Sequence, residues 1–431
     1  MRKKWLVLLV LAAFVMTGLT FSGCKKPEYI KIGIIGPMQF LQGRHHWLGA
    51  QMAEEDINAA GGVKIGDKTY LVKCIQIDTN EILSVDDAAN AVERAITVDN
   101  VDFLVGAFRS EATLAMQDIA MDYKKIFVVC GASHTELSNR VASDYERYKY
   151  WFRVTPENVS YLVKDSLILL TYVAGIVREE LGIQVPKVAV VIEQAVAGDP
   201  LAAAANALIP TMGMQVVGTW RPSPTATDVT AELTAIRDSG AHIIYTYFSA
   251  ASGVPYARQW GELEIPACSV GINVEAQSMG FIDATGGYGN YELTLNTLAP
   301  GCAQTDKTIE FYNKFVERSG EYPTYNAGTY DAIWILTQAV ERAGTLDPDA
   351  IVVEMEKTDY QGAAGRIVFD QRHDVTWGPG FVTAIGTQWQ NGELKCVWPY
   401  EWLLPGMTEP LTYPGTVKYQ IPPWVLEAYG G

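Results

Sequence analysis

The sequence lacks the short motifs by which most enzymes and metal-binding proteins are recognised. It contains no Cys-x-x-Cys pair, no Gly-x-Ser-x-Gly turn, no His-Glu-x-x-His helix and no phosphate-binding Walker loop. The turn from Gly33 to Gly36 has only part of the Gly-x-Gly-x-x-Gly pattern of a dinucleotide site. A zinc ribbon, a serine hydrolase, a metallopeptidase or a nucleotide-dependent enzyme therefore has no support. We expect no catalytic residues, no cofactor and no metal ion.

Positive charge is scarce as well. The 431 residues include 33 Lys and Arg against 49 Asp and Glu, which gives a formal net charge of -16. Proteins that bind nucleic acid need clustered Lys and Arg to neutralise phosphates, so the composition argues against a nucleic-acid partner. The hydrophobic content of 48% is typical of a globular protein, and the acidic surface favours solubility without naming a ligand.

Cysteine is also sparse, with six residues in the chain. Cys74, Cys130 and Cys268 lie in apolar runs, and we interpret them as buried small hydrophobic residues. A bridge between Cys302 and Cys396 is one outcome in an oxidising compartment, and two free thiols are the other. The sequence leaves both open.

The N-terminus has the organisation of an export signal. A basic start at residues 2–4 precedes a nearly uninterrupted apolar run at 5–16, and small residues follow. The segment 21–24, Phe-Ser-Gly-Cys, resembles a bacterial lipobox, although phenylalanine stands where leucine is usual. The resemblance implies a lipoprotein signal peptide at 1–23, lipidation of Cys24 and attachment to a membrane. The alternatives are an ordinary signal peptide and an N-terminal membrane anchor.

The length of the chain exceeds what one compact core usually supports, so two domains are expected. Short apolar runs alternate with helical patterns, which indicates parallel sheets with helices on both faces. In the first series we expect strands at 30–35, 71–77, 101–105 and 126–129, and helices at 48–59, 86–98 and 111–122. In the second we expect strands at 188–192, 216–218, 243–247 and 267–270, and helices at 158–181, from 199 onward, and at 229–237, 309–319 and 325–343.

These elements predict an α/β fold with two similar, doubly wound lobes and a cleft between them. We place the first lobe at 28–157 and 298–376, the second at 158–297 and 377–400, and a proline- and aromatic-rich tail at 401–431. Open parallel sheets bind ligands at the carboxyl ends of their strands. The loops that follow the strands are therefore the candidate site.

Four stretches around these loops resemble the leucine/isoleucine/valine-binding family of periplasmic solute receptors. The similarity runs from about residue 29 to about residue 395. It is carried by 32–37 (IGIIGP), 49–62 (GAQMAEEDINAAGG), 105–113 (VGAFRSEAT) and 130–137 (CGASHTEL). The resemblance implies the type I periplasmic binding protein fold, with two Rossmann-like lobes joined by a multi-strand hinge.

In this family a ligand carboxylate is held after two strands of the first lobe. The resemblance assigns that role to Ser110, Ala132 and Ser133. Hydroxyl groups and backbone N–H groups at helix starts suit a carboxylate, since each hydrogen bond to a charged oxygen contributes about 1.5–3 kcal/mol. The alternative is that the two serines only cap helices. Arg109 is a further candidate because a guanidinium can bind a carboxylate through two hydrogen bonds, and a solvated loop arginine is its alternative.

The positions that hold an α-ammonium group in the family are different here. The resemblance places Asn158, Ala197, Ser249 and Asn273 there, and none is acidic or aromatic. The family's aromatic wall near the first loop falls at Gln42. We expect either a ligand without an α-amino group, such as a carboxylate, an amide or an aromatic acid, or a displaced counter-charge. The candidates for that charge are Glu111, Glu157 and Glu275.

Aromatic and histidine side chains also lie near the expected cleft. Phe40 is a candidate ligand contact, with core packing as the alternative. His45, His46 and His134 do not come with an evident third metal ligand. We therefore interpret these histidines as helix-surface or cleft-rim residues.

Together these features predict a lipid-anchored solute-binding protein outside the cytoplasm that delivers a small polar ligand to an ABC importer. The implied partners are the small molecule, the permease subunits and the membrane, and we expect a monomer. Ligand would bridge the lobes and shift the hinge to a closed form. A sensor that signals to a kinase or chemoreceptor is the alternative, and an envelope enzyme is a further one.

Overall fold

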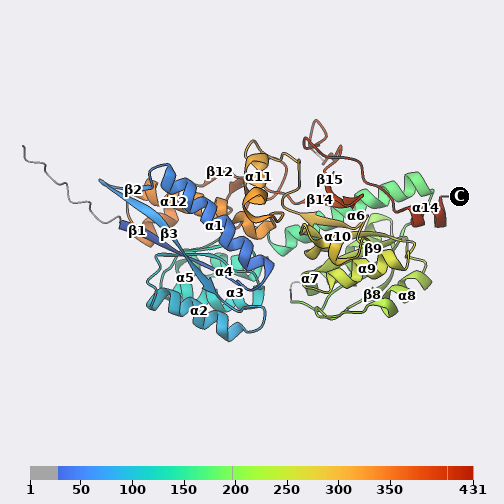
Figure 1. The fold of residues 1–431 in the computed structure, drawn as a ribbon, viewed down its shortest axis with the longest axis horizontal. Coiled ribbons are helices and arrows are strands. Elements are labelled where there is room, and N and C mark those ends of the chain that lie inside the picture. Colours follow the sequence, from blue (N-terminus) through green and yellow to red (C-terminus); the bar gives the residue numbers. More distant parts are fainter. Residues whose placement is uncertain (1–27, 197, 405, 431) are drawn as a thin grey trace, which may run out of the picture.

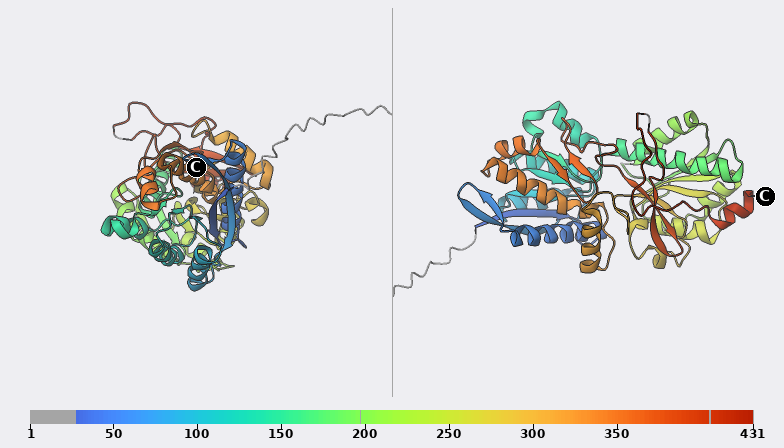
Figure 2. Two further views of the ribbon diagram at one scale, coloured as in Figure 1. Left: turned by 90° about the vertical axis from the view of Figure 1, so that its left-hand side faces the viewer. Right: turned by 90° about the horizontal axis from the view of Figure 1, so that it is seen from above.

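The chain folds into two α/β lobes, each built on one mainly parallel sheet (Figure 1). The computed structural model describes residues 28–196, 198–404 and 406–430. The expected signal peptide at 1–23 and the lipidated Cys24 lie outside these ranges. Figure 2 shows the lobes end to end along the long axis of the molecule. The predicted two-lobe α/β class is confirmed.

The first lobe contains a six-stranded sheet in the order β2-β3-β1-β4-β5-β6. All neighbours in this sheet are parallel except the β2–β3 pair. Its strands are β1 (Glu28–Gly36), β2 (Val63–Ile65), β3 (Lys68–Asp78), β4 (Phe103–Gly106), β5 (Phe127–Val129) and β6 (Trp151–Arg153). Its helices are α1 (Leu41–Ala59), α2 (Val85–Thr97), α3 (Ser110–Asp122), α4 (Glu136–Ser143), α5 (Tyr145–Tyr148), α11 (Thr308–Ser319), α12 (Thr329–Ala343) and α13 (Pro348–Met355).

The second lobe contains a seven-stranded sheet in the order β15-β14-β11-β10-β9-β7-β8. The β11–β14 and β14–β15 pairs are antiparallel, and the remaining pairs are parallel. Its strands are β7 (Lys187–Ile192), β8 (Gln215–Trp220), β9 (Ile243–Phe248), β10 (Cys268–Asn273), β11 (Leu293–Asn296), β14 (Ile385–Gln390) and β15 (Glu393–Trp398). Its helices are α6 (Val159–Leu181), α7 (Gly198–Leu208), α8 (Thr230–Asp238), α9 (Gly253–Glu262), α10 (Phe281–Ala284) and α14 (Pro423–Tyr429).

The central strands are buried along their whole length because helices cover both faces of each sheet. Every residue of β9 and of β10 is buried. Helix α6 is the one described helix long and apolar enough to cross a membrane, but half of its most apolar window is buried inside the protein. Its Asp165 is fully buried and accepts hydrogen bonds from the Ala384 N–H and the Trp377 indole, at 3.0 and 2.9 Å. Helix α6 is therefore a core helix of the second lobe.

The chain passes between the lobes at 154–158, 297–307 and 369–384. A buried ion pair supports two of these passages: Arg153 Nη1 lies 2.9 Å from Asp374 Oδ2, and both side chains are fully buried. The side-chain amide of Asn158 donates to the same carboxylate at 3.1 Å. This network fixes the frame from which the cleft loops extend.

Three predicted elements need correction. Helix α1 begins at Leu41, seven residues before the predicted start at 48, because its first turns pack under the 3₁₀ turn Tyr325–Gly328. The predicted helix 325–343 is this 3₁₀ turn followed by α12. The turn packs closely on the passage at 154–158, since a Cβ on Gly328 would lie 2.4 Å from Thr155 Oγ1. The tail, in which we expected little regular structure, ends in α14, whose Val425 is buried in the hydrophobic core of the second lobe.

Candidate ligand-binding cleft

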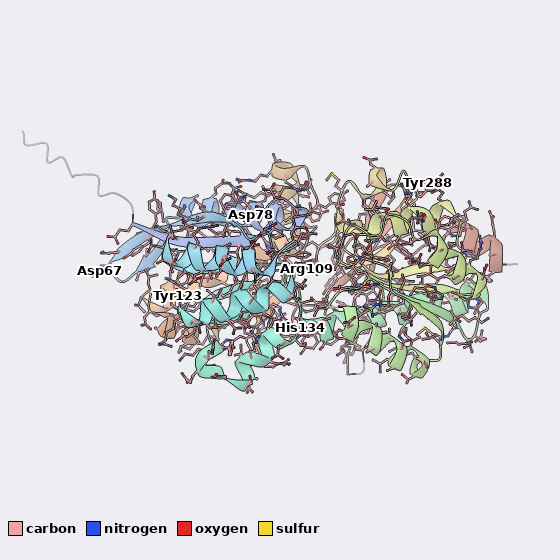
Figure 3. All side chains as sticks on the ribbon, turned by 90° about the horizontal axis from the view of Figure 1, so that it is seen from below. Asp67, Asp78, Arg109, Tyr123, His134 and Tyr288 are labelled. Carbon is pink, nitrogen blue, oxygen red and sulfur yellow. The ribbon has the colours of Figure 1, made fainter. Side chains whose placement is uncertain are left out.

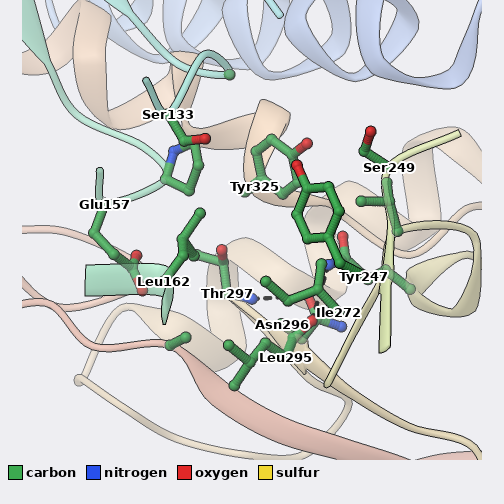
Figure 4. Close-up of a pocket in the computed structure, with 15 residues that line it drawn as sticks. Ser133, Glu157, Leu162, Tyr247, Ser249, Ile272, Leu295, Asn296, Thr297 and Tyr325 are labelled. Atoms are coloured by element: carbon green, nitrogen blue, oxygen red, sulfur yellow. Dashed lines mark hydrogen bonds between the residues drawn. The ribbon is translucent and has the colours of Figure 1, made fainter. Parts of the chain in front are cut away.

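Two adjoining cavities lie between the lobes, at the carboxyl ends of the parallel strands. They contain about 510 and about 370 Å³ of empty space, part of which is open to solvent. In Figure 4, Ser133 and Ser249 lie on opposite sides, with the rings of Tyr325 and Tyr247 between them. Both cavities are lined by Gly131, Ser133, Tyr247, Ser249 and Tyr325. We therefore treat them as one cleft with two chemically different ends.

The first lobe contributes two serine hydroxyls to the cleft. Ser110 is the first residue of α3, and Ser133 follows β5. The two residues are 6% and 8% exposed, and neither hydroxyl has a hydrogen-bond partner within the described ranges. The N-cap residues of α3 and α4 are Arg109 and Thr135, so neither serine caps a helix. The capping interpretation is wrong, and both hydroxyls are available to a ligand.

A buried carboxylate fixes the loop that leads to Ser110. Glu81 accepts hydrogen bonds from the N–H groups of Phe108 and Arg109, at 3.0 and 2.8 Å, and from the Thr79 hydroxyl at 2.9 Å. Burial raises the pKa of Glu81 to about 7, and these hydrogen bonds oppose the rise. Because contacts within the first lobe hold this loop, this half of the site is preorganised.

Arg109 lies at the same end of the cleft and is paired with Glu111. Its Nε and Nη2 atoms are 2.9 and 2.7 Å from Glu111 Oε1. Burial lowers the pKa of Arg109, but Glu111, with Tyr247 and Glu193 of the second lobe, raises it above its ordinary value overall. Figure 3 shows Arg109 and His134 on the edge of the first lobe that faces the second. Glu111 is thus engaged by Arg109, although it was a candidate counter-charge for the ligand.

The second lobe contributes a serine held by a buried carboxylate. Glu193 follows β7 and is fully buried. It accepts hydrogen bonds from the hydroxyls of Ser249 and Ser252, the latter at 3.1 Å, and from the Ala250 N–H at 3.3 Å. Because the Ser249 proton points to Glu193, the remaining lone pairs of Ser249 accept hydrogen bonds on the cleft side, where the Tyr247 hydroxyl also contacts Ser249. The second lobe therefore presents an acceptor backed by negative charge.

The other end of the cleft is mainly apolar. Its apolar lining comes from both lobes and from the passages between them: Pro156, Leu162, Ile272, Val274, Leu295 and Ala384. One acidic side chain, Glu157, interrupts this surface, and its Oε1 atom is buried without a hydrogen-bond partner in the described residues. Burial raises the pKa of Glu157 and of the neighbouring Asp165, and their mutual interaction raises that of Asp165 further. Burial therefore favours the protonated form of both carboxyl groups.

The structure brings together part of the predicted site. Arg109, Ser110, Ser133 and Ser249 all line the cleft. Ala132 is fully buried between the lining residues Gly131 and Ser133. The remaining candidates described, which are Phe40, Gln42, Asn158 and Asn273, are not among the lining residues of either cavity. Ala197 lies outside the described ranges.

The two asparagines are held by the protein itself. Asn158 caps α6 by accepting hydrogen bonds from the N–H groups of Ser160 and Tyr161, in addition to its bond to Asp374. Asn273 is fully buried, and its amide donates to the Gly253 carbonyl at 3.0 Å and to Glu292 at 3.2 Å. Both side chains therefore stabilise the frame around the cleft.

The interpretation of His45 and His46 as surface or rim residues is wrong. Both are fully buried. His45 lies 2.9 Å from Thr324 Oγ1 and 2.8 Å from Glu321 Oε2, and His46 lies 3.0 Å from the Asn326 carbonyl oxygen. Burial lowers the pKa of His46 to about 3. These histidines join α1 to the distant segment 321–326, which leads into the 3₁₀ turn Tyr325–Gly328. Among the described residues, no group of three potential ligands is suited to a metal ion.

Sequence reasoning missed Glu193, Tyr247 and Tyr325. A signal for Glu193 was present, because an acidic residue stands directly after the buried strand expected at 188–192. Tyr247 is the last residue of the strand expected at 243–247, which the same strand-end rule could have identified. Tyr325 comes from a distant segment, and only the fold brings its ring into the cleft.

Comparisons with known proteins agree with this architecture. A family model described as periplasmic binding protein matches residues 29–391. Leu/Ile/Val-binding protein homolog 7 of Brucella abortus (strain 2308) is 22% identical over 380 residues, which cover 86% of this chain and 91% of the relative.

Solved structures share the fold at low sequence identity. A leucine binding protein from Thermotoga maritima aligns with a TM-score of 0.68 at 23% identity, over 85% of this chain and 97% of that protein. A solute binding protein of an ABC transporter from Rhodopseudomonas palustris BisB5, solved with 3,4-dihydroxybenzoic acid, aligns with a TM-score of 0.70 at 18% identity, over 85% and 95%. With a family model that covers most of its length and the fold described above, the chain belongs to the periplasmic binding protein family, as a type I solute-binding protein and not an enzyme.

Proposed function

We propose that this chain is the lipid-anchored, extracytoplasmic binding subunit of an ABC importer for a small organic acid. The acid would carry an apolar body and a hydrogen-bond donor. One observation supports this ligand class above all: donors of the first lobe face an acceptor of the second lobe across a partly apolar cleft.

The first lobe would bind the carboxylate. Ser110 and Ser133 offer two hydroxyl donors without partners in the described ranges, and the N-terminal N–H groups of α3 add to them. Arg109 supplies a nearby positive charge, although Glu111 shares it. Each hydrogen bond to a carboxylate oxygen contributes about 1.5–3 kcal/mol, so two hydroxyls suffice for specific recognition.

The second lobe would bind a donor group of the ligand. Ser249 can accept a hydrogen bond from an N–H or O–H group of the ligand, because its own hydroxyl donates to Glu193. An ammonium group and a phenolic hydroxyl are both suitable donors. Leucine and 3,4-dihydroxybenzoic acid, named for two similar proteins, each combine a carboxylate, an apolar body and such a donor.

Binding would pull the lobes together. A ligand that contacts Ser133 and Ser249 at once favours the closed arrangement by its affinity for both lobes. The permease would then recognise the closed surface, and the lipid on Cys24 would keep the monomeric receptor near the membrane. The family model and the export signal support this role.

A thermal-shift screen of the purified mature chain tests the proposal. The panel should contain branched-chain amino acids, hydroxybenzoates, the corresponding acids without the donor, and the corresponding amides. A ligand at about 100 times its dissociation constant stabilises the protein by about 2.7 kcal/mol. We expect shifts only with acids that carry a donor. A shift with the amides alone would contradict the assignment of the first lobe.

A further inference from the structure

Two cysteines far apart in the sequence meet in the second lobe. Cys302 lies in the passage from β11 to α11, and Cys396 lies in β15. Both are free thiols in the structure, and their side chains pack together beside Thr416. Both residues are buried in a small cluster with Ala299 and Ile385. The other described cysteines lie elsewhere: Cys74 and Cys130 are in the hydrophobic core of the first lobe, and Cys268 is in that of the second lobe.

The C-terminal tail covers this cysteine pair. The Thr416 hydroxyl lies 3.5 Å from Cys396 Sγ, and the Val417 N–H donates to the Cys396 carbonyl at 2.8 Å. On the other side, the Ala303 N–H donates to the Pro414 carbonyl at 3.0 Å. A Cβ on Gly415 would lie 2.0 Å from the Gly301 carbonyl oxygen, so the tail packs directly on the passage that holds Cys302. The tail therefore contacts both cysteine-bearing segments.

We propose that Cys302 and Cys396 form a structural disulfide in the mature protein. The inference rests on the proposed export, because an oxidising compartment allows such bonds to persist. Two buried thiols already in contact need little movement to join. The bond would link a passage between the lobes covalently to β15.

The chemistry is a thiol–disulfide exchange with an external disulfide, such as oxidised glutathione or an oxidised dithiol oxidoreductase. Both thiols are buried beneath the tail in the folded chain, so the exchange takes place during folding, before the tail packs over the pair. The Cys396 thiolate attacks the external disulfide and releases one thiolate, which takes up a proton. Cys302 then loses its proton, displaces the second external sulfur and completes the bond. The pair loses two electrons and two protons, and the external disulfide becomes two thiols.

The position of this bond gives it a role in the hinge. It would tie the start of the passage at 297–307 to β15, so that residues up to Cys302 move with the second lobe. Asn296 and Thr297, which line the cleft, lie just before the cross-link. Bending between the lobes would then fall on the residues that follow Cys302. The bond also closes a long loop, 303–395, and long loops gain the most from cross-linking in the chain-entropy account.

Peptide mapping of the full chain tests the bond directly. The protein is extracted from the cell envelope, denatured without reductant, alkylated with iodoacetamide and digested. We expect a linked peptide pair that contains Cys302 and Cys396, two hydrogen atoms lighter than the separate peptides, and alkylation at Cys74, Cys130 and Cys268. A parallel sample of purified chain is refolded with oxidised glutathione. Alkylation of both Cys302 and Cys396 in the two samples would overturn the inference, whereas a bond only in the refolded sample would sustain it and contradict the proposed location.

Thermal melting separates a disulfide from mere packing. Reduction should lower the Tm of the wild-type chain by about 3–8 °C. The variants Cys302→Ala, Cys396→Ala and the double variant should melt at similar, lower temperatures and should not respond to reductant. The control Cys268→Ala, which removes an equally buried thiol, should keep the response to reductant. Additive losses from the two single variants, or a wild type indifferent to reductant, would contradict the disulfide.

Discussion

The two sides of the cleft differ in how well their polar residues can be predicted from the sequence. On the first lobe, Ser110 and Ser133, to which the resemblance assigns the carboxylate, lie in the loops after β4 and β5 and line the cleft. On the second lobe, Asn158 and Asn273, which the resemblance assigned to the ligand, instead hold the frame, and the charge near the cleft is that of Glu193 after β7.

The difference shows what a family pattern transfers and what it does not. Donors at strand ends and helix starts depend on the backbone, which related proteins share. A counter-charge depends on one side chain, which can come from any strand end that reaches the cleft. The residues of the second half-site therefore have to be identified from the hydrogen bonds in the structure. Substitutions can then separate residues that bind the ligand from residues that hold the frame.

The largest effect should come from breaking the frame. In Asp374→Ala the buried Arg153 loses its ionic partner and Asn158 loses an acceptor. Removing one partner of a buried pair costs about 3–5 kcal/mol of unfolding free energy. Urea denaturation measures this loss. The exposed Asp359 pairs with Arg366, and Asp359→Ala as a control should change stability by at most about 1 kcal/mol. Equal losses of unfolding free energy in the two variants would show that the buried ion pair stabilises the protein no more than an exposed one.

The next effect should come from the first half-site. We expect Ser110→Ala together with Ser133→Ala to weaken binding of an identified acid by about ten- to a hundredfold, because two hydrogen bonds to the carboxylate are lost. Isothermal titration calorimetry gives the affinities. Ser143→Ala, on an exposed end of α4, is the control and should bind normally. An unchanged affinity in the double variant would refute the carboxylate assignment.

The second half-site should show a selective effect. In Glu193→Gln the charge behind Ser249 is removed, so we expect about tenfold weaker binding of ligands with a donor group. Acids without the donor should bind as they do to the wild type. Ser252→Ala removes another contact of Glu193 but no lining residue, and it should have less influence on this selectivity. An equal loss for both ligand classes would show that Glu193 belongs to the frame.

The smallest effect should be a change in the pH dependence of stability. Burial raises the pKa values of Glu157 and Asp165 in the folded protein, while the charge of Asp374 raises that of Glu157 further. Folding therefore favours the protonated pair, and stability should fall as pH rises above the unfolded values of about 4. Glu157→Gln should remove part of this fall, about 1 kcal/mol between roughly pH 5 and pH 8, in denaturant titrations. Parallel pH profiles of variant and wild type would contradict a raised pKa of Glu157 in the folded protein.

The sequence allowed most of the fold to be predicted, because buried parallel strands are continuous apolar runs and their helices have clear starts and stops. The failures have physical causes. The start of α1 carries two histidines that look polar but bond to a segment about 280 residues away. For the site, the strand-end rule pointed to the loops after the strands, and the family resemblance singled out Ser110 and Ser133 within them. Tyr325 could not be found, because only tertiary packing brings its ring to the cleft.

A calorimetric comparison of matched ligands tests the central claim most directly. The wild-type chain and Glu193→Gln are each titrated with one acid found in the screen, with its analogue that lacks the donor, and with its amide. The account predicts that the amide binds weakly to both proteins and that the loss in Glu193→Gln appears only with the donor-bearing acid. Equal binding of acid and amide, or an equal loss for both acids, would contradict a ligand held by its carboxylate on one lobe and its donor on the other.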